Sequence, residues 1–168
     1  MVYLIIGLAM ILVIGPIFWL RPSPRERELA MFRAKAFETG FKVQPLNVRT
    51  DKFYSHVLAR NPHLADDQWV RYSRTAKEDE IAPDIREKWV QRKDREGTLF
   101  WEPSSVQSVP PENVQVLLEG WAKTQAEGVL ALEFGPRTVS VVWNERGEKE
   151  ILDVMLASVL GLFQKRPE

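Results

Sequence analysis

Cysteine is absent from this chain of 168 residues, and histidine occurs only twice. Without thiols, the sequence excludes disulfide scaffolds, cysteine nucleophiles and cysteine-ligated zinc or iron–sulfur centres. The nine glycines never come close enough to form a GxGxxG loop, and the Walker A, GxSxG and HExxH patterns do not occur. We therefore expect no cofactor and no catalytic residue of a common enzyme class.

Metal-binding side chains are similarly sparse. His56 and His63 are followed by Asp66 and Asp67, and this grouping is the strongest suggestion of a metal site. Its spacing matches no common zinc motif. We expect polar loops at these positions and no metal.

Charge is missing from residues 1–20, because all 46 charged residues follow position 20. Twelve of the first twenty residues are Val, Leu, Ile or Phe, and a helix of this length spans about 30 Å, the thickness of a bilayer's hydrocarbon core. Tyr3 and Trp19 stand near the two ends, where aromatic rings prefer the headgroup level. No basic residue precedes the run and no small-residue cleavage site follows it, which argues against a signal peptide. The sequence thus predicts a transmembrane helix over residues 1–20 that anchors the chain in the lipid bilayer.

Cations follow this apolar segment directly. Residues 21–60 carry nine Lys or Arg against four Asp or Glu, and basic residues beside a span stay on the cytoplasmic side. This pattern predicts a single-pass protein of the inner membrane, with its N-terminus outside and its folded domain in the cytoplasm. The cations expected to contact the lipid headgroups are Arg21, Arg25, Arg27, Arg33 and Lys35.

The junction Phe18-Trp19-Leu20-Arg21-Pro22, between the apolar run and the basic segment, resembles the YajC-type accessory subunit of the bacterial preprotein translocase. The resemblance covers residues 1–35, and the family's glycine-rich signature has no counterpart in residues 40–45. It implies a membrane-anchored accessory role beside a protein translocase, with a small cytoplasmic domain.

The rest of the chain predicts an α+β domain in which antiparallel hairpins pack against helices. Ser23 at a helix N-cap, Pro24 after it and Glu26 three residues from the cap predict a helix that ends at Gly40. Periodicity and turn residues predict further helices over 51–60, 111–127 and 148–165, and strands over 41–48, 68–75, 87–92, 98–101, 129–134 and 138–143, with a loop over 102–111. We divide the chain into a span (1–20), a basic juxtamembrane helix (21–40) and one cytoplasmic domain (41–168).

Large apolar side chains are expected in the core of that domain, including the five tryptophans beyond residue 20. The C-terminal helix is apolar nearly all round, which fits either a buried core helix or an interface. If part of this apolar surface meets a partner, the residues that we expect to contact it are Trp69, Tyr72, Ile151, Met155, Leu162 and Phe163.

Residues 61–168 carry fourteen basic against nineteen acidic residues, and this negative balance argues against nucleic-acid binding. The sequence therefore predicts a membrane-anchored accessory or adaptor protein without enzymatic activity, whose domain contacts a membrane protein complex such as a translocase. The alternative is a membrane-tethered enzyme with titratable groups in a groove. The oligomeric state stays open.

Overall fold

The computed structural model describes residues 22–105, 109–124, 128–146 and 149–166, together with Tyr3, Gly7 and Met10. The chain divides into two compact units, Met1–Ala34 and Lys35–Glu168. The larger unit contains the sheet and the helices that pack on it.

Helix α2, Pro24–Glu38, begins with the predicted capping box. The Ser23 amide donates to the Glu26 carboxylate over 2.6 Å, and the Glu26 amide donates to the Ser23 hydroxyl oxygen over 3.2 Å. Gly40 follows the helix with a φ of +87°, a left-handed conformation that glycine adopts without strain. The predicted start and stop of this helix are therefore confirmed.

The prediction of a membrane protein is contradicted by the helices of the structure. Within the described residues, none of the helices is both long enough and apolar enough to cross a bilayer. The longest of them, α2, has 15 residues and carries charges along its length, so it reaches only about 22 Å against ~30 Å of hydrocarbon. This finding contradicts three predictions: the transmembrane helix, the single-pass topology, and the inner-membrane location with the N-terminus outside. Apart from Tyr3, Gly7 and Met10, the predicted span over residues 1–20 lies outside the described residues.

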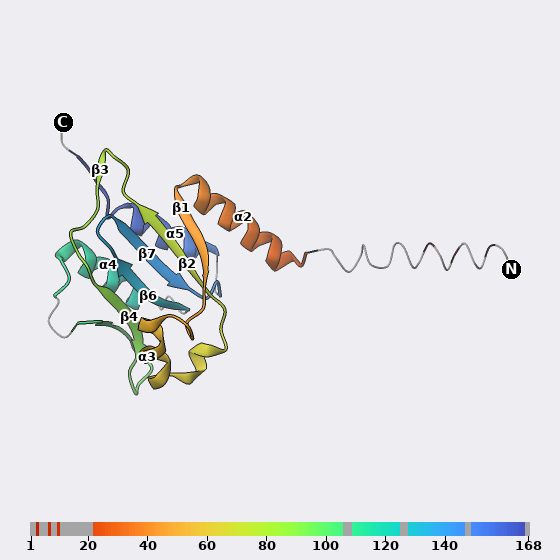
Figure 1. Cartoon of the computed structure of the whole chain (residues 1–168), viewed down its shortest axis with the longest axis horizontal. Helices are drawn as coiled ribbons and strands as arrows, with labels where there is room; N and C mark the ends of the chain where they lie inside the picture. Colours follow the sequence, from red (N-terminus) through yellow and green to blue (C-terminus); the bar gives the residue numbers. More distant parts are fainter. Residues whose placement is uncertain are drawn as a thin grey trace. The chain divides into compact units, whose positions relative to one another are not determined.

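A six-stranded antiparallel sheet forms the centre of the larger unit (Figure 1), which confirms the predicted hairpins. The strand order is β1-β2-β7-β6-β4-β5, so β1 and β5 are the two edges. The strands are β1 (Phe41–Leu46), β2 (Trp69–Thr75), β4 (Lys88–Lys93), β5 (Leu99–Pro103), β6 (Val129–Phe134) and β7 (Thr138–Trp143). Pro45 lies on β1, and a proline is tolerated there because one side of an edge strand needs no ladder hydrogen bond.

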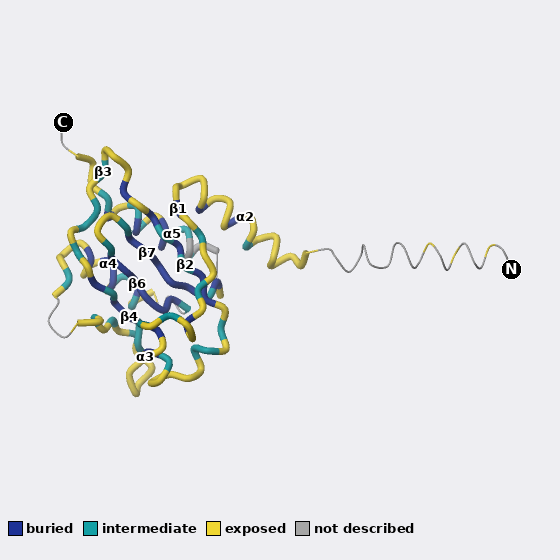
Figure 2. Tube along the Cα trace, in the orientation of Figure 1, coloured by how far each residue is buried: buried dark blue, intermediate teal, exposed yellow. Residues whose placement is uncertain are grey.

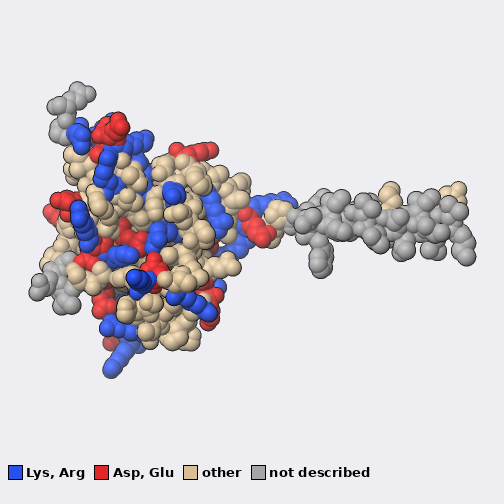
Figure 3. Space-filling view, viewed as in Figure 1, with Lys and Arg blue, Asp and Glu red and all other residues tan. Residues whose placement is uncertain are grey.

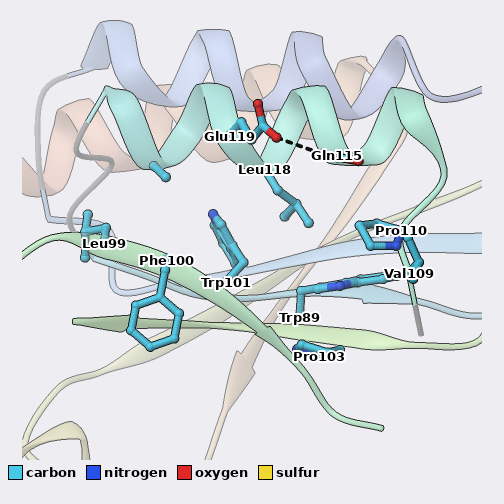
Figure 4. A pocket seen from close by; sticks show the side chains of 11 residues that line it. Trp89, Leu99, Phe100, Trp101, Pro103, Val109, Pro110, Gln115, Leu118 and Glu119 are labelled. Carbon is cyan, nitrogen blue, oxygen red and sulfur yellow. Dashed lines mark hydrogen bonds between the residues drawn. The ribbon is translucent and has the colours of Figure 1, made fainter. Parts of the chain in front are cut away.

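Helices cover both faces of the sheet. Helix α3 (Lys52–Arg60), followed by a short 3₁₀ helix at Pro62–Ala65, lies over one face. Tyr54 and Val57 of α3 pack there with buried residues of the inner strands. Helices α4 (Glu112–Lys123) and α5 (Lys149–Leu160) lie on the opposite face (Figures 1 and 4). Because it is covered on both sides, every residue of β6 is buried, and Figure 2 shows the buried trace concentrated in the inner strands.

The C-terminal end of the chain differs from the prediction. Helix α5 ends at Leu160, whereas the apolar pattern predicts a helix to residue 165. Gly161 follows, and the amides of Leu162 and Phe163 donate to carbonyls three residues earlier, which tightens and ends the helix. The chain then forms β8 (Gln164–Lys165), which pairs with the two-residue strand β3 (Glu80–Ile81).

Candidate functional site

An apolar groove of about 440 Å³ lies between α4 and the edge strand β5. Its walls include Trp89 on β4, Leu99 and Trp101 on β5, and Leu118 on α4. In Figure 4, Leu118 points from the helix toward the two tryptophans, and Glu119 and Gln115 lie on the same helix, joined by a hydrogen bond. The groove is therefore built by one edge strand, its neighbour and one helix.

Local structure explains why these side chains meet. Successive residues of a strand point to opposite faces, so Leu99, Trp101 and Pro103 share the face under α4 while Phe100 points away from the helix (Figure 4). On α4, Leu118 lies on the buried side of an amphipathic helix and is 4% exposed. The Trp101 ring stands 6.1 Å from that of Trp121, centroid to centroid, so the groove wall packs against the buried side of α4.

The rim of the groove exposes apolar surface. Val109 is 85% exposed there, and Phe100, on the opposite face of the same edge strand, is 45% exposed. The indole nitrogen of Trp101 is buried, and within the described residues it has no hydrogen-bond partner. A buried donor without a partner is unfavourable, so this nitrogen lowers the stability of the groove wall.

A second pocket of about 370 Å³ opens beside the 3₁₀ helix, lined by polar residues over a floor that includes Trp69. Several of its polar side chains pair with one another or with neighbours. Asp67 pairs with Arg146 over 2.7 Å and accepts from Asn144 over 3.3 Å, and Arg92 pairs with Glu102 over 3.1 Å. Within the described residues, the side-chain nitrogen of Gln91 in this pocket is buried without a partner, so the pocket differs from the groove in its polar lining.

A buried ionic network surrounds Glu133 on the α3 side of the sheet. Glu133 is 8% exposed, and its carboxylate accepts from the Tyr54 hydroxyl over 2.8 Å. Arg71 Nε and Lys88 Nζ approach it at 2.8 and 2.9 Å. The Lys88 ammonium also lies 4.5 Å from the centroid of the Phe53 ring, a cation–π distance. The network thus ties α3 to β2, β4 and β6.

The protonation of these groups follows from their surroundings. Burial and the adjacent Glu133 charge and hydrogen bond raise the pKa of Tyr54 well above its usual range. Burial would raise the pKa of Asp51, but the Phe53 and Tyr54 amides and the charges of Lys88 and Arg71 outweigh it, and the pKa lies below its ordinary value. These residues are the groups that a membrane-tethered enzyme would need. A raised pKa keeps Tyr54 neutral, and its hydroxyl is already donated to Glu133, so the network joins α3 to the sheet.

The residues predicted to meet a partner are placed mainly in the core. Trp69, Tyr72, Met155 and Leu162 are each at most 5% exposed. Ile151 and Phe163 are half-buried, and the Phe163 ring packs against the Arg74 guanidinium at 5.1 Å. The sequence left open whether the C-terminal helix is part of the core or an interface. Met155 and Val159 are buried in the core, whereas Val154 on the same helix is 58% exposed.

The predicted anchor and lipid flank are only partly described. Tyr3 is exposed, whereas Trp19 and Arg21 lie outside the described residues. The remaining cations are exposed on α2: Arg25, Arg27, Arg33 and Lys35. Of these, Lys35 forms an ion pair with Asp153 of α5, at 2.8 Å.

The predicted tryptophan core is confirmed for Trp69, Trp89, Trp121 and Trp143, each at most 4% exposed, whereas Trp101 is half-buried in the groove wall. His63 and Asp67 line the polar pocket, and His56 is exposed on α3. No group of three or more metal-ligating side chains occurs in the described stretches of the chain.

Sequence reasoning missed the groove, although it placed both of its elements. The strand over 98–101 and the helix from 111 were predicted, and the alternation of Leu99, Trp101 and Pro103 already indicates one apolar strand face. The missing information was that this strand is a sheet edge and that α4 lies over it. No family model, curated protein or solved structure matches the chain, so its residues and geometry carry the functional argument.

Proposed function

We propose that this chain is a non-catalytic binding module, an adaptor, that recognises a segment of a partner protein in the groove between β5 and α4. The observation that carries the proposal is the apolar groove itself, with its exposed rim, at the edge of a sheet. Pockets with aromatic walls in which water is displaced are typical centres of protein interfaces.

Two further observations support binding rather than catalysis. Of the four described residues with a displaced pKa, Asp51, Tyr54 and Arg71 gather around Glu133, and the fourth, Glu26, is at the start of α2. None of the four lines the groove. Cationic and anionic side chains are interspersed on the face shown in Figure 3. A mixed surface of this kind favours a protein partner over a polyanion.

The test uses the full chain as bait for a random peptide display library, followed by titration of the tightest peptide. Val109→Asp places a charge on the groove rim, and Ala122→Trp fills the groove from α4. Each should weaken binding by about tenfold or more, which corresponds to ~1.4 kcal/mol. Val116→Asp is the matched control, because Val116 is 65% exposed on α4 and does not line the groove.

The control should bind within about twofold of the wild type. Circular dichroism and the urea midpoint establish that each variant is folded. The proposal is wrong if no peptide is enriched, or if the enriched peptides bind Val109→Asp and Ala122→Trp as tightly as the wild type.

A further inference from the structure

The hydrogen bonds of the β4–β5 hairpin determine which backbone groups of β5 face outward. The Asp94 amide donates to the Thr98 carbonyl over 3.0 Å, and the Ser104 amide donates to the Lys88 carbonyl over 2.7 Å. The two pairs continue the register of the hairpin by one residue beyond each of its ends. Hydrogen-bonded and non-bonded pairs alternate in an antiparallel ladder, so the even-numbered residues of β5, such as Phe100, bond inward to β4.

The odd-numbered residues of β5, namely Leu99, Trp101 and Pro103, therefore direct their backbone groups away from β4. Among the described residues, no hydrogen bond is made to the amides or carbonyls of Leu99 and Trp101. Pro103 has a carbonyl but no amide. This outer edge offers two amides and three carbonyls within five residues, which is room for a short strand.

The side chains of these same residues form the wall of the groove. A strand that pairs with β5 would share its pleat, so every second side chain of that strand would enter the groove beside Leu99 and Trp101. Successive entering side chains would be about 7 Å apart. The unpaired backbone edge and the apolar groove thus select the same ligand conformation, an extended peptide.

Charge defines the peptide further. Among the described residues that line the groove, Glu119 alone is charged, and it is exposed on α4. Its carboxylate accepts from the Gln115 side chain over 2.9 Å, and a carboxylate can accept further hydrogen bonds. A Lys or Arg of the ligand would therefore be favoured next to the apolar side chains.

The opposite edge of the sheet is less suited to a ligand strand. On β1, Lys42, Gln44 and Pro45 are exposed. Lysine on an edge strand discourages pairing with another chain, and Pro45 stands inside β1 whereas Pro103 is the last residue of β5. The edge at β5 instead has Phe100, 45% exposed, beside an apolar groove.

We propose that the outer edge of β5 pairs with an extended segment of the partner protein, whose alternate apolar side chains enter the groove and which places a Lys or Arg beside Glu119. This inference rests on the proposed binding function and specifies its mode, which is strand addition. Pro103 limits the added strand to the length of Leu99–Pro103.

Amide hydrogen exchange of the full chain tests the pairing, with the tightest peptide from the display selection as the probe. Binding should slow exchange of the Leu99 and Trp101 amides by at least about tenfold. The Phe100 amide is the internal control, because it bonds to β4 in both states and should change little. Equal protection of residues 99, 100 and 101, or none, would contradict strand addition.

N-methylation of the peptide gives the complementary measurement. Methylating every second amide within the bound segment should weaken binding at least tenfold, whereas methylating the amides between them should change it less than threefold. A periodicity of three to four residues would indicate a bound helix and would overturn the inference. The proposed binding function would still hold in that case, provided that Val109→Asp and Ala122→Trp weaken binding of the peptide.

Charge reversal tests the Lys or Arg. Glu119→Lys should weaken binding of the selected peptide about fivefold. When the Lys or Arg of the peptide is replaced by norleucine, the wild type and Glu119→Lys should bind the peptide equally well. Glu112→Lys, an exposed position on α4 outside the groove, is the matched control. Protection of the Leu99 and Trp101 amides that rises with protein concentration alone would assign the edge to a second copy of this chain and contradict the proposal.

Discussion

Glu133 and Asp51 show how single charged residues stabilise a covered sheet face. Glu133 is buried, yet Arg71, Lys88 and Tyr54 supply it with two cations and a hydroxyl donor. Asp51 stands at the N-cap of α3, where its carboxylate accepts from the Phe53 amide over 2.9 Å. Buried charges are tolerated when they are paired and hydrogen-bonded, and here the pairing attaches α3 to the strands beneath it.

The lowered pKa of Asp51 predicts a dependence of stability on pH. Because its pKa is lower in the folded chain than in the unfolded chain, the Asp51 charge stabilises the fold above the unfolded pKa of about 3.9. That contribution is lost as the pH falls through the folded value. Asp51→Asn keeps a good N-cap and removes the charge, so it should be less stable than the wild type at pH 7 and approach it near pH 3.

Urea unfolding of both proteins between pH 7 and pH 3 measures this difference. Asp51→Ala distinguishes the effect of the N-cap hydrogen bonds from the effect of the charge, because it removes both. Its free energy of unfolding at pH 7 should be about 1 kcal/mol lower than that of Asp51→Asn. A gap between wild type and Asp51→Asn that is the same at pH 7 and pH 3 would contradict the assigned role of the charge.

Turns and helix ends set the limits of the elements, and glycine is required at only some of them. Gly128 precedes β6 with a φ of +92°, and a Cβ at this position would collide with the Asn144 side chain. Gly120 lies within α4, where a Cβ would meet no atom within 4 Å. The same substitution should therefore have opposite effects at the two positions.

Gly128→Ala should lower the free energy of unfolding by about 1–3 kcal/mol, because the new side chain is strained and displaces Asn144. Gly120→Ala should raise it by roughly 0.5–1 kcal/mol, because alanine has the higher helix propensity. Chemical denaturation of both variants measures the pair. Stabilisation by Gly128→Ala would show that the turn before β6 does not need its left-handed conformation.

The larger unit is closed at one corner by the last residues of the described chain. Strand β8 pairs with β3, and the Arg166 amide donates to the Asp79 carbonyl over 2.7 Å. The Arg74 guanidinium holds the β3 segment from the other side, with Glu80 at 2.8 Å. This corner joins segments that are more than eighty residues apart in the sequence.

Deleting residues 164–168 should loosen that corner without unfolding the sheet. We expect amide exchange at residues 79–81 to rise by about tenfold or more. The free energy of unfolding should fall by less than about 2 kcal/mol, because only a few hydrogen bonds are lost. Deletion of residues 167–168 alone is the control and should leave exchange at 79–81 unchanged. Global unfolding of the longer deletion would mean that β8 is part of the core.

Local sequence determined most of the elements of this protein. The capping box at Ser23, the left-handed Gly40 and the hairpin around Gly135-Pro136 act through neighbouring residues, so helix and strand positions can be read directly from them. The membrane prediction was wrong within the described chain, because it extended a hydropathy argument from residues 1–20 to the topology and location of the whole molecule. Hydropathy of a segment does not specify what the rest of the chain forms.

Only the tertiary structure decided which strand is an edge and what lies over it. Trp89, Trp101 and Leu118 come together because β4 pairs with β6, β5 is left at the margin, and α4 packs across that margin. The Glu133 network likewise joins residues from α3, β2, β4 and β6. Strand order and helix docking depend on contacts between distant segments, and local periodicity carries no information about those contacts.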